Sequence, residues 1–296
     1  MATLLGLAVA LTYGCGDFFG GMAAKRTATT TVVVGSFALS AVALAVITAA
    51  WAVVGGLPSP APHDIVLGVA TGCMGPVALG FLYRGLATGR MSVVAPITAV
   101  VAAIVPLGWG IARGDRPSGL AIAGVAVALV AVALISGAPS PAEVTADDPA
   151  ARRAVLGAFA SGAGFGVIFV LLGSTSHHAG LWPLLTARVV AVGVTAAAMA
   201  VVVAVRGGPP SVLARLVPER SAWRFVIFSG VLDTAANATY LAAVHRGLLS
   251  IVAVLSSLYP ASTVALARVI LHERFHRVQV AGLVLAAVGV AAMAAG

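Results

Sequence analysis

The chain has 296 residues, of which 60% are hydrophobic and only 9% are charged. A soluble domain carries about 25% charged residues, so this composition excludes water as the main solvent. The net charge of +8 does not indicate a nucleic-acid partner, because the basic residues stand at the ends of apolar runs, where they act as topology signals. We therefore expect an integral membrane protein.

Ten apolar runs are long enough, or nearly so, to cross a hydrocarbon core, which needs about 20 residues per helix. In chain order they are 4–24, 31–54, 65–87, 91–112, 119–136, 154–173, 181–205, 223–244, 249–271 and 278–295. Lipid forces each backbone polar group to pair within its own segment, and no short alternating strands are visible. The sequence predicts an all-α membrane protein with ten transmembrane helices.

The longest polar gap divides these helices into two groups of five. We predict a first unit at 1–137, a connecting loop at 138–153 and a second unit at 154–296. A shift of 158 residues (250 − 92) superposes similar positions of the two units. The superposed pairs are Ser92 with Ser250, Ala95 with Ala253, Asp115 with Glu273, Arg116 with Arg274, Gly124 with Gly282 and Gly72 with Gly230. Five helices per unit turn the second unit upside down, so we predict two inverted repeats, an arrangement typical of alternating-access transporters.

Ionisable residues within the helices are the main candidates for a site. A charge at the bilayer centre costs at least about 2.5 kcal/mol, so such residues face the bundle interior or a wet cavity. Asp233 shares one helix face with Asn237 and Tyr240, and Asp17 follows Tyr13 by one turn. An aspartate here would bind a proton or a cationic group; the alternative is a fixed ion pair or a polar network that stabilises the fold.

Further candidates lie in the same and neighbouring helices. Arg188 or Arg84 would balance the charge of an aspartate, and Tyr83 precedes Arg84. Prolines within helices remove a backbone hydrogen bond and bend the helix, and the freed carbonyls can line a cavity. We therefore assign kink and cavity-lining positions as follows: Pro96, Ser256, Tyr259 and Pro260. The cavity itself is expected between the helices at 4–24, 65–87 and 91–112 and their counterparts at 154–173, 223–244 and 249–271.

One motif points to a different class of protein. His272, Glu273 and His276 form H-E-x-x-H, which on a helix can bind zinc and supply a general base. The motif falls at a break between two helices, and no third ligand is evident. An intramembrane metalloprotease is therefore kept only as an alternative, together with a non-transporting scaffold or lipid-handling protein.

Several stretches resemble the EamA family of the drug/metabolite transporter superfamily. They are LSSLYPASTV at 255–264, LHER at 271–274, QVAG at 279–282 and YGCGDFFGG at 13–21. The resemblance implies ten helices in two halves and a proton- or gradient-driven exporter of metabolites, amino acids or drugs that works as a single chain. The resemblance also implies that both termini are cytoplasmic. The distribution of basic residues predicts the opposite: three lie on the membrane face that holds the termini and thirteen on the other face, which favours termini outside the cell.

Together these patterns predict a multi-pass protein of the plasma (inner) membrane that is not an enzyme. We expect a secondary active transporter, most simply an exporter, that alternates access around the central cavity under a proton or substrate gradient. Its expected partners are a small-molecule substrate, membrane lipid and protons, with no cofactor and no bound metal.

Overall fold

The structure is a computed structural model that describes residues 2–54, 56, 58–87, 91–136, 149–206, 218–271 and 277–295. Within these residues all regular secondary structure is helical. The helices are α1 (Ala2–Ala24), α2 (Thr29–Val54), α3 (Pro62–Ala87), α4 (Met91–Ala112), α5 (Gly119–Ser136), α6 (Pro149–Gly173), α7 (Trp182–Arg206), α9 (Trp223–Val244), α10 (Leu249–Ser256), α11 (Tyr259–Leu271) and α12 (Arg277–Ala295). Because α10 and α11 continue one another, the described residues form ten helical rods, which confirms the all-α fold and the helix count.

Length and surface both fit a bilayer. Seven of the described helices are long and apolar enough to cross a membrane, and three shorter apolar stretches accompany them at Ile97–Ala112, Gly119–Ile135 and Leu249–Thr263. Large apolar side chains stand on the outer surface, among them Val53, Val54 and Leu4. Such a surface is stable against lipid tails and would be costly in water. The chain is a multi-pass membrane protein.

The predicted first and last residues of α4, α5 and α9 agree with the structure, whereas the predicted starts of α3 and α6 are wrong. The predicted loop at 138–153 is too long, because α6 already begins at Pro149, and α3 begins at Pro62 rather than at residue 65. Proline suits the first turn of a helix, where its missing N–H would be unpaired anyway. A prediction from hydrophobicity alone therefore made both helices too short.

The predicted helix at 249–271 is broken in the middle. It ends as α10 at Ser256 and restarts as α11 at Tyr259, and Pro260 stands in the first turn of the new helix. The N–H of Leu258 donates to the carbonyl oxygen of Leu255 at 3.2 Å, a tighter turn than an α-helix allows. Pro260 has no N–H to continue the helical ladder, so the chain bends here.

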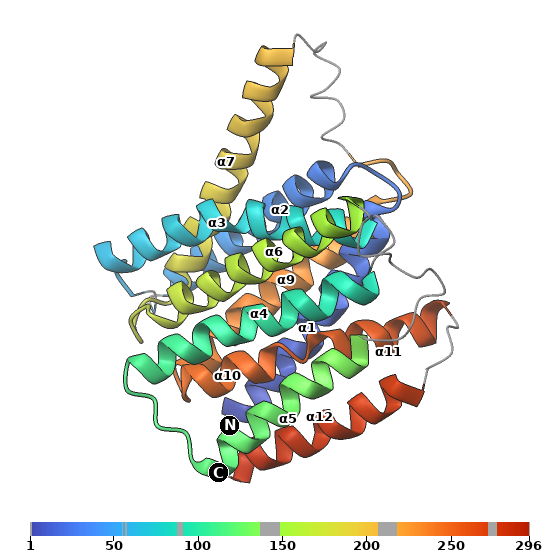
Figure 1. The fold of residues 1–296 in the computed structure, drawn as a ribbon. Coiled ribbons are helices and arrows are strands. Elements are labelled where there is room, and N and C mark those ends of the chain that lie inside the picture. The colour runs from blue at the N-terminus through green and yellow to red at the C-terminus, as the bar shows by residue number, and fades with distance from the viewer. Residues whose placement is uncertain are drawn as a thin grey trace.

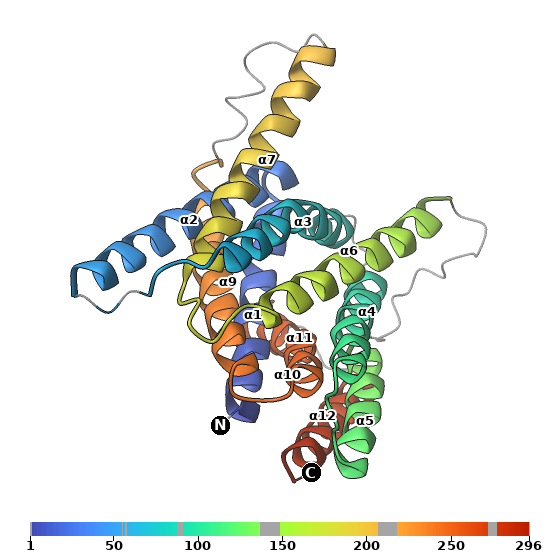
Figure 2. The same ribbon diagram turned by 90° about the vertical axis from the view of Figure 1, so that its left-hand side faces the viewer.

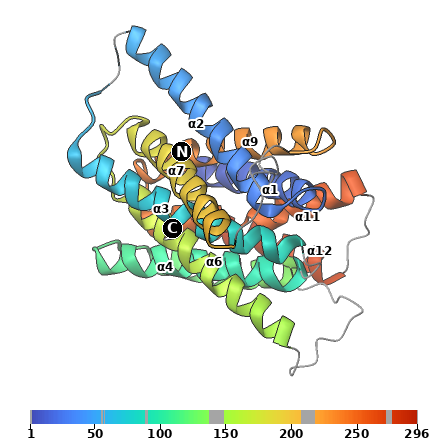
Figure 3. The ribbon, with the colours of Figure 1, turned by 90° about the horizontal axis from the view of Figure 1, so that it is seen from above.

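The helices pack mainly across the two halves of the chain. α1 lies against α9 and against the broken pair α10–α11, while α6 lies against α3 and α4. α2 contacts α7 and α9, α3 contacts α7, α4 contacts α10, and α5 pairs with α12 (Figures 1 and 2). Seen from above, α6 crosses over α4 (Figure 3). The two halves therefore interlock rather than form separate bodies.

Both ends of the chain lie at one end of the bundle (Figures 1 and 2). We call this end the terminal face; it carries the turns α2–α3, α4–α5, α6–α7 and α9–α10. The opposite end, with the turn α1–α2 and the start of α9, carries Lys25, Arg26, Arg220 and Arg224 and is called the basic face.

Glycines allow close approach where helices of different halves cross. A Cβ atom on Gly14 of α1 would overlap the carbonyl oxygen of Tyr259 and lie 2.5 Å from Cβ of Ser262 on α11. Where α5 packs on α12, a Cβ on Gly124 of α5 would come within 2.8 Å of the carbonyl oxygen of Gly289 on α12. Close packing through small residues is the main source of helix association in lipid, where burial from water contributes nothing.

We expect Gly14→Ala to destabilise the protein by about 1–3 kcal/mol, the usual cost of overpacking. The added methyl group has no free volume at the α1–α11 crossing. Gly193→Ala is the matched control, because nothing lies within 4 Å of a Cβ at Gly193, also in a helix. Thermal denaturation in detergent should show a lower midpoint for Gly14→Ala only; equal midpoints for the two variants would contradict this packing role.

Candidate functional site

An ion pair between α7 and α9 forms the centre of a buried polar cluster. The guanidinium of Arg188 donates to the carboxylate of Asp233, and the two side chains are only 8% and 22% exposed. Nε of Arg188 also donates to the hydroxyl of Ser40 on α2 at 3.1 Å. The guanidinium carbon lies 4.9 Å from the ring centre of Phe37, also on α2, so three helices hold the arginine in place.

Asp233 is satisfied on its other side as well. The side-chain amide of Asn237 donates to Oδ1 of Asp233 at 3.2 Å and to its backbone carbonyl oxygen at 2.8 Å. One turn of α9 thus holds the carboxylate for Arg188, while Thr234 beside it hydrogen-bonds to Ser40. Both carboxylate oxygens of Asp233 thus contact side chains of the cluster, Arg188 at one oxygen and Asn237 at the other.

Asp17 on α1 differs from Asp233 in having no partner in the described part of the chain. It is half-buried and makes no hydrogen bond or ion pair with the described residues. Next to it, a Cβ on Gly16 would lie 3.4 Å from Cβ of Leu232 and 3.5 Å from the backbone nitrogen of Asp233, so α1 and α9 are in close contact. The two carboxylates interact electrostatically. Because the charges of Arg188 and Asp233 balance one another, the net charge of the cluster depends on whether Asp17 carries a proton.

Tyr83 of α3 completes the cluster towards the basic face. Its hydroxyl lies 3.0 Å from the hydroxyl of Ser229 on α9, and the side chain is 2% exposed. A Cβ on Gly20 of α1 would overlap the Tyr83 ring and hydroxyl, so only glycine admits the tyrosine here. Tyr83 therefore seals the space between α1, α3 and α9 one turn beyond Asp17.

An aromatic layer lies on the other side of the cluster, towards the terminal face. Phe169 of α6 stacks on Tyr240 of α9 with ring centres 4.6 Å apart, and Tyr13 of α1 lies 6.0 Å from Phe169. The hydroxyl of Tyr240 donates to the carbonyl oxygen of Phe169 at 3.1 Å. The buried rings of Phe169 and Tyr240 and the partly buried ring of Tyr13 separate Asp17 and Asp233 from the terminal face.

Hydrogen bonds between the two halves join them at the terminal face. The carboxylate of Asp64, at the start of α3, accepts from the backbone N–H and the hydroxyl of Ser176 at 2.8 and 2.6 Å. The carboxylate of Asp115 accepts from the backbone N–H of Ser250 at the start of α10 at 3.0 Å. The indole N–H of Trp182 donates to the carbonyl oxygen of Pro58 at 2.8 Å.

Two histidines of the second half of the chain lie close together at the terminal face. The rings of His177 and His245 lie 4.7 Å apart, and Nε2 of His245 lies 3.3 Å from the hydroxyl of Thr175. Burial lowers the pKa of His245 from its ordinary value of 6.5, with the charge of His177 as the second cause. A neutral His245 at pH 7 lets the two rings stack without repulsion.

The predicted site residues fall into two groups in space. The structure brings together Asp17, Asp233, Asn237, Arg188 and Tyr83. Tyr13 and Tyr240 lie in the aromatic layer, between this cluster and the terminal face. Arg84 lies apart, on the exposed side of α3. The charge of Asp233 is thus balanced by Arg188 and not by Arg84.

The kink positions lie at the α1 crossing. Tyr259 is 9% exposed and packs against α1, and the hydroxyl of Ser256 donates back to the carbonyl oxygen of Val252 at 2.8 Å. Thr263 of α11 donates to the carbonyl oxygen of Gly14 at 3.0 Å. Pro260 marks the α10–α11 break, and the side chain of Pro96 lies outside the described residues. The bend therefore contacts α1 directly, one turn from Asp17.

Helix α2 was absent from the predicted site, yet it supplies Ser40 and Phe37. Neither residue carries a signal in the sequence, because serine in a membrane helix usually bonds its own backbone and phenylalanine is common in lipid-facing positions. Only their contact with Arg188 reveals their role. The cluster therefore lies among α1, α2, α3, α7 and α9.

No zinc site is supported by the described part of the chain. Within it, no three His, Cys, Asp or Glu side chains come close enough to hold a metal ion. The motif residues His272, Glu273 and His276 lie outside the described residues. The metalloprotease alternative thus gains no structural support.

Comparison with known proteins gives a family match for the second half of the chain and a structural match for its fold. Residues 152–295 match the family model described as "EamA-like transporter family". A solved structure titled "Crystal structure of protein" is similar over nearly the whole chain, with a TM-score of 0.71, 20% identity, and 98% of this chain and 95% of that chain covered. This identity shows the fold alone. No curated protein matches the sequence.

Proposed function

We propose that this chain, whose residues 152–295 form an EamA-like transporter domain, is a secondary active transporter that moves a small molecule across the membrane by alternating access. The observation that carries the proposal is the unpaired carboxylate of Asp17 beside the balanced Arg188–Asp233 pair. The metalloprotease and scaffold alternatives have no comparable support.

Two inverted five-helix repeats are the first element of the proposal. Exchanging each helix for its counterpart turns the α1–α9 contact into α6–α3, the α1–α11 contact into α6–α4, and α2–α9 into α7–α3, and all of these contacts occur. Superposed glycines behave alike: Gly124 of α5 packs on α12 and Gly282 of α12 packs on α5. Gly72 of α3 packs on α7, and Gly230 of α9 packs on α2. This reciprocity supports a pseudo-two-fold axis between the halves.

Closure at the terminal face is the second element. The bonds of Asp64 and Asp115 to the other half, together with the aromatic layer, shut the polar cluster off from that face. Breaking these few bonds and separating the rings would expose Asp17 there, with the α10–α11 bend taking up the motion of α1. A small number of extramembrane hydrogen bonds is easily exchanged for water.

Coupling to a proton is the third element. A charged carboxylate in a dry interface is costly, and binding a proton or a cationic group removes that cost. Because Arg188 and Asp233 cancel, the state of Asp17 decides the net charge of the cluster. We infer a substrate among metabolites, amino acids or drugs, with a cationic group favoured when Asp17 is ionised.

The proposal is tested in two steps. Thermal-shift screening of amino acids and cationic drugs against the detergent-solubilised chain should identify a compound that raises the melting midpoint, because a ligand of the folded state stabilises it. The same compound should then enter proteoliposomes in counterflow and under an imposed pH gradient. A binder that is never transported, in protein shown to be folded, would refute the transport proposal.

A further inference from the structure

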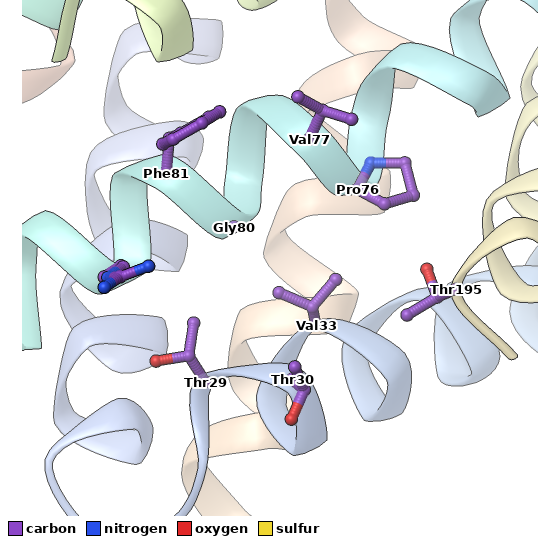
Figure 4. A pocket seen from close by; sticks show the side chains of 9 residues that line it. Thr29, Thr30, Val33, Pro76, Val77, Gly80, Phe81 and Thr195 are labelled. Carbon is purple, nitrogen blue, oxygen red and sulfur yellow. The ribbon is translucent and has the colours of Figure 1, made fainter. Parts of the chain in front are cut away.

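A hollow lies apart from the polar cluster, between α2, α3 and α7. It has a volume of about 500 Å³ and opens to the outside of the bundle. In Figure 4, Thr29, Thr30 and Val33 of α2 lie across the gap from Pro76 and Gly80 of α3. We call this hollow the α2–α3 groove.

The groove is polar at one end and mainly apolar along its length, where Thr195 of α7 also lines it. Arg84 lies in the last turn of α3, and Thr29 and Thr30 form the first turn of α2, so the polar end is at the level where both helices leave the membrane. Val33 and Val77 line the groove deeper in the bilayer. Pro76 is eight residues (84 − 76) from Arg84 and so about 12 Å deeper, close to half of a hydrocarbon core of about 30 Å.

The arginine at the polar end has no partner among the residues that the structure describes. Arg188 pairs with Asp233, and Arg26 and Arg224 lie over the ring of Phe225 at 4.2 and 4.8 Å. Arg84 makes no ion pair, hydrogen bond or ring contact with the described residues and is exposed. A guanidinium presents a planar fork of donors that fits a phosphate, and its alkyl stem can lie along apolar surface.

The walls of the groove belong to the lipid-facing surface. Val77 and Phe81 are 49% and 40% exposed, although both belong to a membrane-spanning helix. Val33, on the opposite wall, is 3% exposed and gives the groove an apolar floor. A water-soluble anion would bind only at the Arg84 end and leave this apolar length uncovered.

We infer that the α2–α3 groove binds one anionic membrane phospholipid. Its phosphate would lie at Arg84 with the threonine hydroxyls as further donors, and one acyl chain would run along Val33, Val77 and Phe81. The groove opens near the basic face, whose positive charges suit an anionic leaflet. This inference is independent of the transport proposal, although Arg84 adjoins Tyr83 of the polar cluster.

The test measures lipid retention by native mass spectrometry on the full chain in detergent, with phosphatidylglycerol and phosphatidylcholine of identical acyl chains. Wild-type protein should retain one phosphatidylglycerol in preference to phosphatidylcholine. Arg84→Gln should weaken phosphatidylglycerol binding by roughly tenfold, the effect of losing a hydrogen bond to a charged group. Arg220→Gln, an exposed arginine of the basic face outside the groove, should leave it unchanged.

A second variant tests the apolar length separately. Gly80→Leu should fill the groove and abolish retention, and it should fold normally because nothing lies within 4 Å of a Cβ at Gly80. Gly193→Leu is its control, with equally open surroundings outside the groove. Helical content by circular dichroism verifies folding of each variant.

Three outcomes would overturn the inference. Equal retention of both lipids by the wild type would show that the groove does not recognise the negative charge of the headgroup. Unchanged phosphatidylglycerol binding in Arg84→Gln or in folded Gly80→Leu places the lipid elsewhere. Displacement of phosphatidylglycerol by inorganic phosphate alone would identify a free-anion site rather than a lipid site.

Discussion

Asp17→Asn should abolish transport driven by a pH gradient while leaving counterflow exchange measurable. The amide has nearly the shape of the carboxylic acid, but it neither carries charge nor releases a proton. Because Asp17 has no partner among the described residues, this substitution breaks no ion pair and should leave the fold intact. Uptake of the compound found by the thermal-shift screen, with a pH dye inside the proteoliposomes, measures substrate and proton flux together.

Glu219→Gln provides the matched control for this experiment. Glu219 is an exposed acid at the basic face, outside the polar cluster, and the same change of acid to amide should have no effect on either flux. Proton-coupled uptake that persists in Asp17→Asn at the wild-type rate would remove Asp17 from the coupling step. Loss of uptake in both variants would show that the effect is one of surface charge.

Arg188→Met should lower the free energy of unfolding by about 3–5 kcal/mol, because it leaves Asp233 buried without its counter-charge. The arginine also contacts Ser40 and Phe37, so its loss loosens α7 from α2. Unfolding in increasing denaturant, followed by circular dichroism in mixed micelles, measures the change. This is the largest stability effect we expect from a single substitution in the cluster.

The double variant Arg188→Met with Asp233→Leu separates a structural pair from a functional one. Replacing both charges by apolar side chains should restore most of the lost stability, since buried ion pairs and apolar pairs of similar volume are often equivalent. If the double variant folds but no longer transports, the pair is part of the site. A double variant as unstable as Arg188→Met alone would mean that the ion pair itself is not the source of the loss.

Helix positions could be predicted from the sequence because lipid imposes a simple requirement on composition. Runs such as 91–112 and 223–244 end at charged or turn-forming residues, and the structure places α4 and α9 at these bounds. The starts of α3 and α6 were missed because prolines and polar residues form their first turns outside the apolar run. The bend at Pro260 was predictable, since proline cannot donate to the helical ladder.

The site was predictable only in part, and the reason is geometric. Asp17, Arg188 and Asp233 attract attention because charge is rare within the spans, but their pairing depends on how α7 and α9 are rotated. Periodicity places Asn237 beside Asp233, yet nothing in the sequence indicates that Arg188 rather than Arg84 reaches it. That choice depends on the α2–α7–α9 packing and is visible only in three dimensions.

Movement of the two halves can be followed with spin labels at both ends of the bundle. Cys15 and Cys73 are the two cysteines of the chain, and serine can replace them to give a background for labelling. One labelled pair, His63→Cys with His178→Cys, spans the halves at the terminal face. The other, Lys25→Cys with Arg220→Cys, spans them at the basic face, and all four positions are exposed.

Electron–electron resonance distances for these two pairs, in acidic and in alkaline buffer, test the central claim most directly. Alternating access around Asp17 predicts opposite changes: as one pair moves apart the other comes together, and neither responds in Asp17→Asn. Distances at both faces that stay the same across the pH change, or that lengthen together, would contradict a carrier whose halves rock about a titrating carboxylate.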